Sequence, residues 1–380
     1  MKGQPEVPDR ILLTTVNRLG DCVAFLPVAA AVRRRYPSGR ITMMTRRAGA
    51  EAARLTGTVD EFIIVSGARE ESCVLRARNF ARALRAVRAG RFDLAFMASG
   101  DNSATCALLF LGGVKRRTGF DDCKLRGLLS VRVAAPEEEL EARRNVRLLP
   151  AAGLPEELER PPCRIPAPRR AEAQSILEKA GACGGRRVMI HPGSSLAGRR
   201  WPARQFAEIC ARLLRTGLAQ PVLVEGPGEP GLGAETRRLA GQQVPVISQL
   251  GGIDLLAAVM SECDLFVGHS SGPLQIAFLL GLRTVSLWGD TNPKIWGPAW
   301  EAERHVILRS PLPCAGCERW DPKRHVIVRG PVGSAGVNQP PCEHCVEGIP
   351  ADEVFKAISG QLAADEGLVA GSATERKPDR

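Results

Sequence analysis

The sequence has few aromatic residues and no long apolar run. Phe, Trp and Tyr make up 4% of its 380 residues, with a single Tyr, so a platform that stacks the bases of single-stranded nucleic acid would have few side chains to use. No stretch approaches the roughly 18 to 20 consecutive apolar residues that a transmembrane helix needs. Residues 1–10 are charged and lack the apolar core of a signal peptide. These absences predict a cytoplasmic protein without a nucleic acid partner.

Acidic residues are outnumbered by basic ones. The chain has 41 Asp and Glu against 52 Lys and Arg, a formal net charge of +11, which favours phosphate-bearing partners or an anionic surface. A chain of this length with 44% apolar residues can bury two cores, so we expect two domains.

Strand and helix patterns alternate along the chain, which predicts an α/β fold with parallel sheets. Before a Pro-rich linker at 155–170, the expected strands are 11–16, 41–45, 62–65 and 92–98, and the expected helices are 22–36, 74–89 and 137–153. After the linker, the expected strands are 187–190, 222–225, 265–268 and 284–288. Ligands of such sheets bind where the strands end.

Asp21 follows the first expected strand, at that ligand-binding edge. Its carboxylate could act as a general base that takes a proton from an acceptor hydroxyl, or it could cap the helix expected from residue 22. Spacing alone leaves both interpretations open. Asn17 and Arg18, in the same turn, are candidates for binding the acceptor, as are Lys115 and Arg116. For the last two, a solvated basic face is the alternative.

The second half carries a candidate site for a diphosphate and a ribose. Ser194, Ser195, Arg199 and Arg200 follow one strand, and hydroxyls, backbone N–H groups and guanidinium groups there can bind anionic oxygens. Glu229 follows the next strand, where a carboxylate can accept both ribose hydroxyls; an ordinary acidic turn is the alternative.

A third polar turn lies between the strand expected at 265–268 and a helix. Ser270, Ser271, Gly272 and Pro273 make up its end and the start of that helix. The first N–H groups of a helix have no intrahelical partner, and they suit a phosphate. We therefore expect this turn to bind the same diphosphate.

Together these motifs resemble the lipopolysaccharide heptosyltransferases, glycosyltransferase family 9. The resemblance covers residues 10–358 and rests on four stretches in order, namely residues 20–21, 191–202, 226–229 and 267–277. It implies a GT-B fold, with two Rossmann-like domains whose sheets face a cleft. The donor nucleotide would bind to the second domain and the acceptor to the first.

The resemblance also implies the reaction. Heptose, or a related sugar, would pass from an ADP-activated donor to a lipopolysaccharide core acceptor with inversion at the anomeric carbon. Asp21 matches the proposed catalytic base of the family, and catalysis would need no metal. The acceptor would be a phosphorylated glycolipid, and peripheral contact with the inner face of the inner membrane would suit the basic charge.

The chain departs from the family pattern at three positions. Arg199 stands where the family commonly has Lys, Ser270 where it usually has Asp, and Gln275 where it usually has His. Two alternatives therefore remain: a heptosyltransferase-like enzyme that modifies a protein hydroxyl, and a catalytically inactive nucleotide-sugar-binding protein. An oxidoreductase is disfavoured, because no GxGxxG turn follows the first strand of either domain.

Four of the twelve cysteines form two CxxC pairs, which are Cys314, Cys317, Cys342 and Cys345. Such pairs can hold a structural Zn or Fe ion, and reduced, unliganded thiols are the alternative. Cysteines often occur in this region of the family, and a related group that glycosylates autotransporter proteins holds iron with them.

These patterns divide the chain into four parts. Residues 1–165 form the N-terminal, acceptor-binding domain, and residues 166–349 form the C-terminal, nucleotide-sugar-binding domain. Residues 350–366 form a helix that the resemblance expects to pack back towards the first domain. Residues 367–380 are polar and expected to be disordered.

Overall fold

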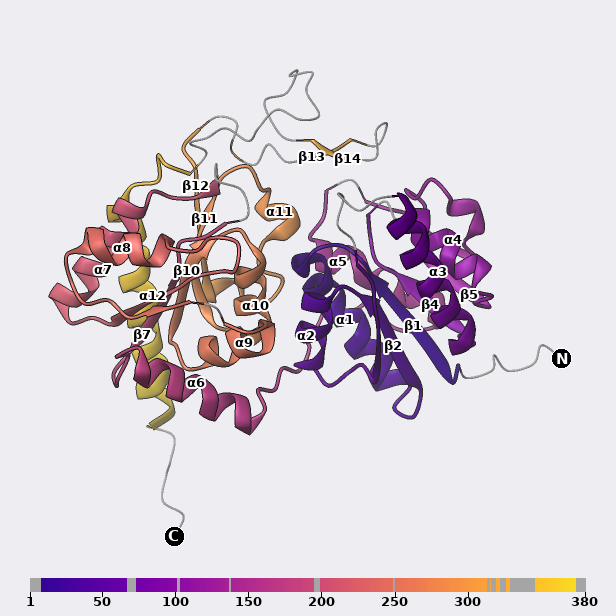
Figure 1. Cartoon of the computed structure of the whole chain (residues 1–380), viewed down its shortest axis with the longest axis horizontal. Helices are drawn as coiled ribbons and strands as arrows, with labels where there is room; N and C mark the ends of the chain where they lie inside the picture. The colour runs from indigo at the N-terminus through magenta and orange to yellow at the C-terminus, as the bar shows by residue number, and fades with distance from the viewer. Residues whose placement is uncertain are drawn as a thin grey trace, which may run out of the picture. The chain divides into compact units, whose positions relative to one another are not determined.

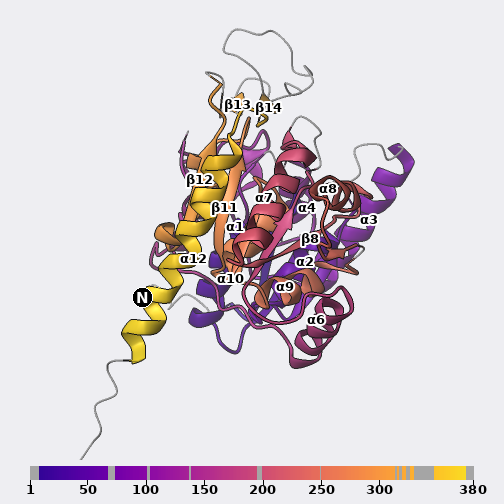
Figure 2. The same ribbon diagram turned by 90° about the vertical axis from the view of Figure 1, so that its left-hand side faces the viewer.

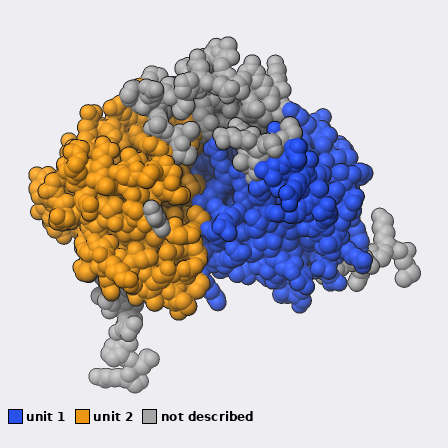
Figure 3. Space-filling model, in the orientation of Figure 1, with its two compact units in different colours: residues 1–164, 294–299, 320–327 blue, residues 165–293, 300–319, 328–380 orange. Residues whose placement is uncertain are grey.

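In the computed structural model, the described residues are 8–66, 73–100, 103–136, 138–194, 199–248, 250–312, 315, 319–321, 326–328 and 346–373. The chain divides into two compact units, which Figure 3 colours separately. Unit 1 comprises Met1–Arg164, Lys294–Ala299 and Trp320–Ile327, and unit 2 comprises Ile165–Pro293, Trp300–Arg319 and Val328–Arg380. In the part of the chain that is described, no helix is both long and apolar enough to cross a membrane.

Unit 1 is built on a six-stranded parallel sheet with the order β3-β2-β1-β4-β5-β6. Its strands are β1 (Arg10–Thr15), β2 (Arg40–Thr45), β3 (Glu61–Ile64), β4 (Leu94–Met97), β5 (Arg116–Phe120) and β6 (Val131–Val133). Its helices are α1 (Leu19–Arg35), α2 (Arg47–Arg54), α3 (Cys73–Gly90), α4 (Ser103–Leu111), η1 (Arg126–Leu128), α5 (Glu141–Val146) and η2 (Leu149–Ala152). The strand order reverses between β1 and β4, which makes the carboxyl ends of these two strands the expected place for a ligand.

Unit 2 repeats this plan with the order β12-β11-β10-β7-β8-β9, and Figure 1 labels β7, β10, β11 and β12 of this sheet. Its strands are β7 (Arg187–His191), β8 (Gln220–Val224), β9 (Val246–Ile247), β10 (Leu265–His269), β11 (Arg283–Trp288) and β12 (His305–Arg309). Its helices are α6 (Ala167–Lys179), α7 (Ala203–Thr216), α8 (Leu232–Ala240), α9 (Ile253–Ser261), α10 (Gly272–Leu280), η4 (Ala302–Arg304) and α12 (Ala351–Ala373). The order reverses between β7 and β10. Three short elements, α11 (Pro293–Trp296), β13 (Arg319–Asp321) and β14 (Val326–Val328), complete the described chain.

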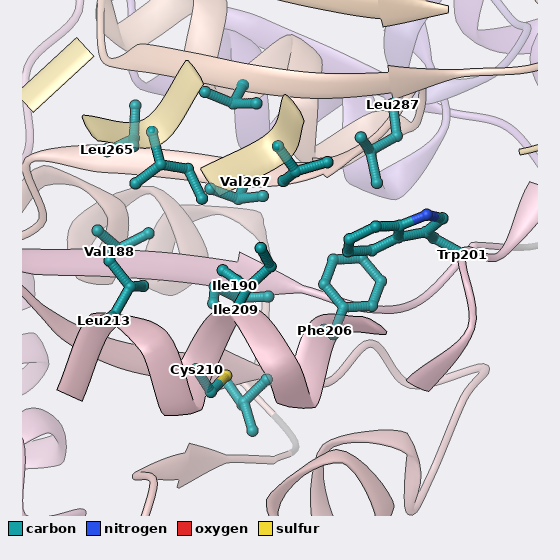
Figure 4. Packing of buried hydrophobic residues seen from close by; sticks show 14 of the residues in the cluster. Val188, Ile190, Trp201, Phe206, Ile209, Cys210, Leu213, Leu265, Val267 and Leu287 are labelled. Carbon is teal, nitrogen blue, oxygen red and sulfur yellow. The ribbon is translucent and has the colours of Figure 1, made fainter. Parts of the chain in front are cut away.

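The central strands are buried along almost their whole length because helices cover both faces of each sheet. In unit 2, Val188, Val267 and Leu287 from three neighbouring strands are almost fully buried. Figure 4 shows them in the same cluster as Trp201 and Phe206, whose rings meet edge to face with centroids 4.9 Å apart. This core holds the strand ends of unit 2 in place.

The last helix, α12, belongs to this same core. Val354, Ile358 and Leu362 are at most 1% exposed and pack in the core of unit 2, and Figure 2 shows α12 running alongside β11 and α7. The apolar stripe of this helix is therefore buried in unit 2, and its packing towards the first domain stays a prediction. The helix also continues to Ala373, beyond the expected start of a disordered tail at residue 367.

Three other expectations differ from the structure. Helix α1 begins at Leu19 and not at residue 22. The helix expected over 137–153 is two short pieces, α5 and η2, of which the second contains Pro150. The basic stretch at 115–118 forms the start of a strand, β5, that was not among the expected strands.

The four cysteines of the two CxxC pairs, Cys314, Cys317, Cys342 and Cys345, lie outside the described residues.

Candidate functional site

The predicted donor-binding turns of unit 2 meet at one edge of its sheet. Ser194 follows β7, Glu229 follows β8, Ser271 follows β10, and Asp290 follows β11. These four strands are neighbours and parallel, so their carboxyl ends lie side by side. Ser195 lies outside the described residues.

His269 ties two of these turns together at the point where the strand order reverses. Its Nδ1 lies 3.0 Å from the carbonyl oxygen of Gly193, and its Nε2 accepts a 2.7 Å hydrogen bond from the backbone N–H of Trp201. Because Nε2 accepts, the proton of the neutral ring sits on Nδ1 and donates to Gly193. Burial lowers the pKa of His269 to about 3. The contacts of His269 are not among the features predicted from the sequence, in which a His at the last position of a buried strand was the available signal.

Ser271 lies at the start of α10 with its hydroxyl unused. It is the N-cap residue of the helix, and its buried Oγ has no hydrogen-bond partner among the described residues. Gly272 begins the first turn, where backbone N–H groups lack intrahelical partners, and Pro273 follows it without an N–H of its own. A buried hydroxyl beside a helix amino end can bind an anionic oxygen. The backbone N–H of Ser270, by contrast, donates to Leu287 of the neighbouring strand.

Arg199 does not present an open guanidinium group to a ligand. Its Nη2 donates a 2.7 Å hydrogen bond to Asp290 Oδ2, and its Nε lies 2.7 Å from Oδ1. Arg200 Nε donates to the carbonyl oxygen of Ser194 at 2.9 Å. Both predicted diphosphate ligands thus lie at the expected edge, and the charge of Arg199 is already balanced by a carboxylate.

Glu229 folds over the turn that follows β7. A Cβ atom added to Gly193 would lie 2.3 Å from Glu229 Oε2, and one added to Gly226 would lie 2.7 Å from the same oxygen. Both positions therefore need glycine to let the carboxylate approach. Partial burial raises the pKa of Glu229, and the charge of Arg200 opposes that effect.

A neighbouring carboxylate, Glu225, has a different role. Its Oε1 accepts hydrogen bonds from the backbone N–H groups of Gly233 and Ala234, at 2.6 and 3.2 Å, and its Oε2 accepts one from Ser248 Oγ at 2.6 Å. It therefore caps α8 and fastens β8 to β9. Both carboxylate oxygens of Glu225 thus accept hydrogen bonds within the protein. Of the two glutamates that follow β8, Glu229 is therefore the better candidate for binding a ligand.

Asp21 of unit 1 lies in the first turn of α1. Its Oδ2 accepts a 3.0 Å hydrogen bond from the backbone N–H of Arg18, the N-cap residue. This contact explains why the helix begins before residue 22. Asp21 is half-buried and lies just beyond the carboxyl end of β1, where it caps the helix through Oδ2.

Asn145 joins the elements around this turn. Its Oδ1 accepts a hydrogen bond from Ser99 N at 3.1 Å, and its Nδ2 donates to the carbonyl oxygens of Glu141 and Ala24, at 2.9 and 3.5 Å. Asn17 Nδ2 donates to Ser99 O at 3.5 Å. The turns after β1 and β4 are thereby held against α1 and α5, at the point where the order of this sheet reverses.

Glu141 is a buried carboxyl group near Asp21. It begins α5, which packs on α1, and is 7% exposed. Burial raises its pKa to about 7, Arg144 opposes this rise, and the charge of Asp21 adds to it. Glu141 is not among the residues predicted from the sequence, since nothing local distinguishes it from the neighbouring glutamates.

Lys115 and Arg116 lie at the other edge of the sheet. Lys115 Nζ lies 2.8 Å from Asp93 Oδ1, and Arg116 Nη2 donates to the carbonyl oxygen of Ala151. Arg116 begins β5, whereas Asp21 follows the end of the parallel strand β1. The structure therefore does not bring these two cations to Asp21, because parallel strands place their starts and ends at opposite edges.

A metal site was predicted from the cysteines of the sequence. Over the residues that the structure describes, no group of three or more His, Cys, Asp or Glu side chains is placed to hold a metal ion. The four-cysteine site predicted from the sequence falls on residues outside them and stays a prediction.

Two doubly wound units, each with polar turns at the carboxyl ends of its strands, define the GT-B class of α/β proteins. Residues 80–324, more than half of the chain, match the profile of glycosyltransferase family 9 (heptosyltransferase). The chain belongs to this family and is heptosyltransferase-like.

Relatives and solved structures agree with this assignment. A Haemophilus influenzae protein provisionally named a glycosyltransferase is 23% identical over 319 residues, 80% of this chain and 90% of that protein. The family 9 structure from Veillonella parvula has a TM-score of 0.76 at 21% identity and covers 94% of this chain and 97% of that one. For the ADP-heptose lipopolysaccharide heptosyltransferase II of E. coli, the TM-score is 0.70 at 18% identity, with coverage of 94% and 99%. At these identities, the two structures establish the fold.

Proposed function

We propose that this protein transfers a heptose, or a related sugar, from an ADP-activated donor to a lipopolysaccharide core acceptor, with inversion at the anomeric carbon. The observation that carries the proposal is the buried Ser271 hydroxyl, which lacks a partner among the described residues and lies at the start of α10. His269 fastens the end of the same strand to Gly193, over which Glu229 folds. A diphosphate at Ser271 would thus have a carboxylate for the ribose at a nearby strand end.

Asp21 supplies the base in this proposal. Its carboxylate takes the proton of the acceptor hydroxyl as that oxygen attacks the anomeric carbon, and the bond from this carbon to the diphosphate breaks. Attack from the side opposite the leaving group inverts the configuration. The nucleoside diphosphate departs as an anion, which the N–H groups of α10 and Arg200 stabilise without a metal ion.

The test begins with the donor. ADP and ADP-sugars should raise the midpoint of thermal unfolding, whereas UDP, GDP and their sugars should not, since a ligand that binds only the folded state stabilises it. Stabilisation by UDP-sugars alone would overturn the donor assignment.

Sugar transfer to a lipopolysaccharide core acceptor is then measured with the wild type and with Asp21→Asn. Loss of transfer with retained ADP binding is expected, and Asp352→Asn, which removes an exposed carboxylate, is the control.

A second candidate is a nucleotide-sugar-binding protein without transferase activity. The observation that favours it is the ion pair between Arg199 and Asp290, which occupies a cation predicted to face the diphosphate. This candidate requires ADP binding without turnover over a panel of donors and acceptors, including a protein hydroxyl. Turnover of any one acceptor that depends on Asp21 would reject it.

A further inference from the structure

Helix α3 of unit 1 carries charged side chains of one sign only. Its 18 residues include five arginines and no Asp or Glu. Its inner side is apolar, since Ala83 and Val87 are buried in the core and Phe80 packs against them. The helix is therefore packed in the core of unit 1 through one side, and its other side faces away from that core.

The arginines follow that outer side. Arg78, Arg82, Arg85 and Arg88 are exposed and recur at intervals of four and three residues, which places them along one side of a helix. Within the described part of the chain, Arg78, Arg82 and Arg85 make no ion pair. Arg88 Nε donates to the carbonyl oxygen of Leu111 at 3.1 Å. The stripe thus carries positive charge that no described carboxylate balances.

Apolar side chains flank the same stripe. Val74 is 80% exposed and Leu75 is 41% exposed, one turn before Arg78. The adjacent helix α4 exposes Phe110 and Leu111, each by 48%, and Figure 1 shows α3 and α4 side by side. Large apolar side chains next to unbalanced arginines are unusual on a surface that contacts only water.

We propose that the outer side of α3, together with Phe110 and Leu111 of α4, is a docking surface for an anionic lipid bilayer. Arginines at the level of the lipid phosphates and apolar side chains at the acyl boundary are the two parts of interfacial membrane binding. A nucleic acid would use the arginines but has no place for Val74 or Leu75, and the charge complementarity therefore favours lipid. This surface is independent of the transfer reaction and holds the enzyme at a membrane whatever its acceptor is.

The experiment uses the full chain and sedimentation with vesicles. Binding is expected to vesicles of phosphatidylcholine with phosphatidylglycerol, and it should weaken with salt; vesicles of phosphatidylcholine alone should bind poorly. The triple variant Arg78→Gln/Arg82→Gln/Arg85→Gln should lower the partition coefficient about a hundredfold. Val74→Ser/Phe110→Ser should lower it also in high salt.

The matched control is Arg215→Gln/Arg237→Gln/Arg238→Gln, which removes three exposed arginines from α7 and α8 of unit 2. It should leave vesicle binding almost unchanged, with thermal unfolding as the check that both triple variants fold. An equal loss in the two triple variants would overturn the proposal, because it would reduce the effect to net charge. Absence of vesicle binding, or equal binding to a DNA duplex at the same salt concentration, would also overturn it.

Discussion

Arg199 and Asp290 form a buried ion pair between residues 91 positions apart in the chain, with both guanidinium–carboxylate distances at 2.7 Å. The side chains are 10% and 3% exposed. Burial removes both charges from water, so each depends on the other for compensation. The pair joins the turn after β7 to the turn after β11 across the candidate donor site.

Removal of one partner of this ion pair should therefore lower the stability of the folded protein strongly. Arg199→Met leaves the Asp290 carboxylate without its cation and should lower the free energy of unfolding by about 3 to 5 kcal/mol. The double variant Arg199→Met/Asp290→Leu should recover most of this loss, as measured by urea unfolding. Arg34→Met, which breaks an exposed pair with Glu159, should cost less than about 1 kcal/mol. Equal losses in the single and double variants would contradict this account.

The His269 clamp gives a second prediction. His269→Ala removes the acceptor of the Trp201 N–H and the donor to Gly193 O, and it leaves a cavity beside Phe206. We expect a loss of about 3 to 5 kcal/mol at pH 7, measured by urea unfolding. Ser270→Ala, at the next position, should change the stability by less than about 1 kcal/mol. A mild effect of His269→Ala would show that the two turns are held by other contacts.

The same clamp should make the protein sensitive to acid. The pKa of His269 falls from its ordinary 6.5 to about 3 in the folded state, so between these values the unfolded state binds the proton and the folded state does not. Stability should therefore fall as the pH drops from 6.5 towards 3. The slope of stability against pH should be shallower in His269→Gln than in the wild type, and an unchanged slope would assign the acid sensitivity to other groups.

Glu141 should act in the opposite direction. Its pKa is about 7 in the folded state against 4.5 for an ordinary glutamate, so its contribution is fully present below pH 4.5 and is lost as the pH rises through 7, by about 3 kcal/mol. Glu141→Gln should become more stable than the wild type as the pH rises through this window. Glu157→Gln, at an exposed position, should follow the wild type throughout. Parallel curves for wild type and Glu141→Gln would contradict the prediction.

A substitution at Gly193 should weaken ADP binding without a large loss of stability. Gly193→Ala places a Cβ atom 2.3 Å from Glu229 Oε2, and the flexible carboxylate can move away at little cost in stability but loses its position. We expect the Kd for ADP to rise about tenfold, roughly the loss of one charge-assisted hydrogen bond, by titration calorimetry. Gly228→Ala, with open space around its Cβ and no unusual backbone, should bind ADP like the wild type. Normal binding by Gly193→Ala would remove Glu229 from the donor site.

Much of the architecture follows from local patterns. The strands β7, β10 and β11 and the helix α3 begin and end within one residue of their predicted positions. Alternation of strand and helix implies parallel sheets, and parallel sheets put the turns after their strands at one edge. For this reason Ser271 and Glu229 could be assigned to a common edge before any contact was known.

The sequence by itself therefore determined the fold class, the family and the turns that carry the candidate site. Only the tertiary structure decided which groups are free to act there. It paired Arg199 with Asp290, set Lys115 at the edge opposite Asp21, and buried α12 in unit 2. The physical reason is that strand and helix patterns repeat over a few residues, whereas ion pairs and packing depend on strand order and on partners far away in the chain.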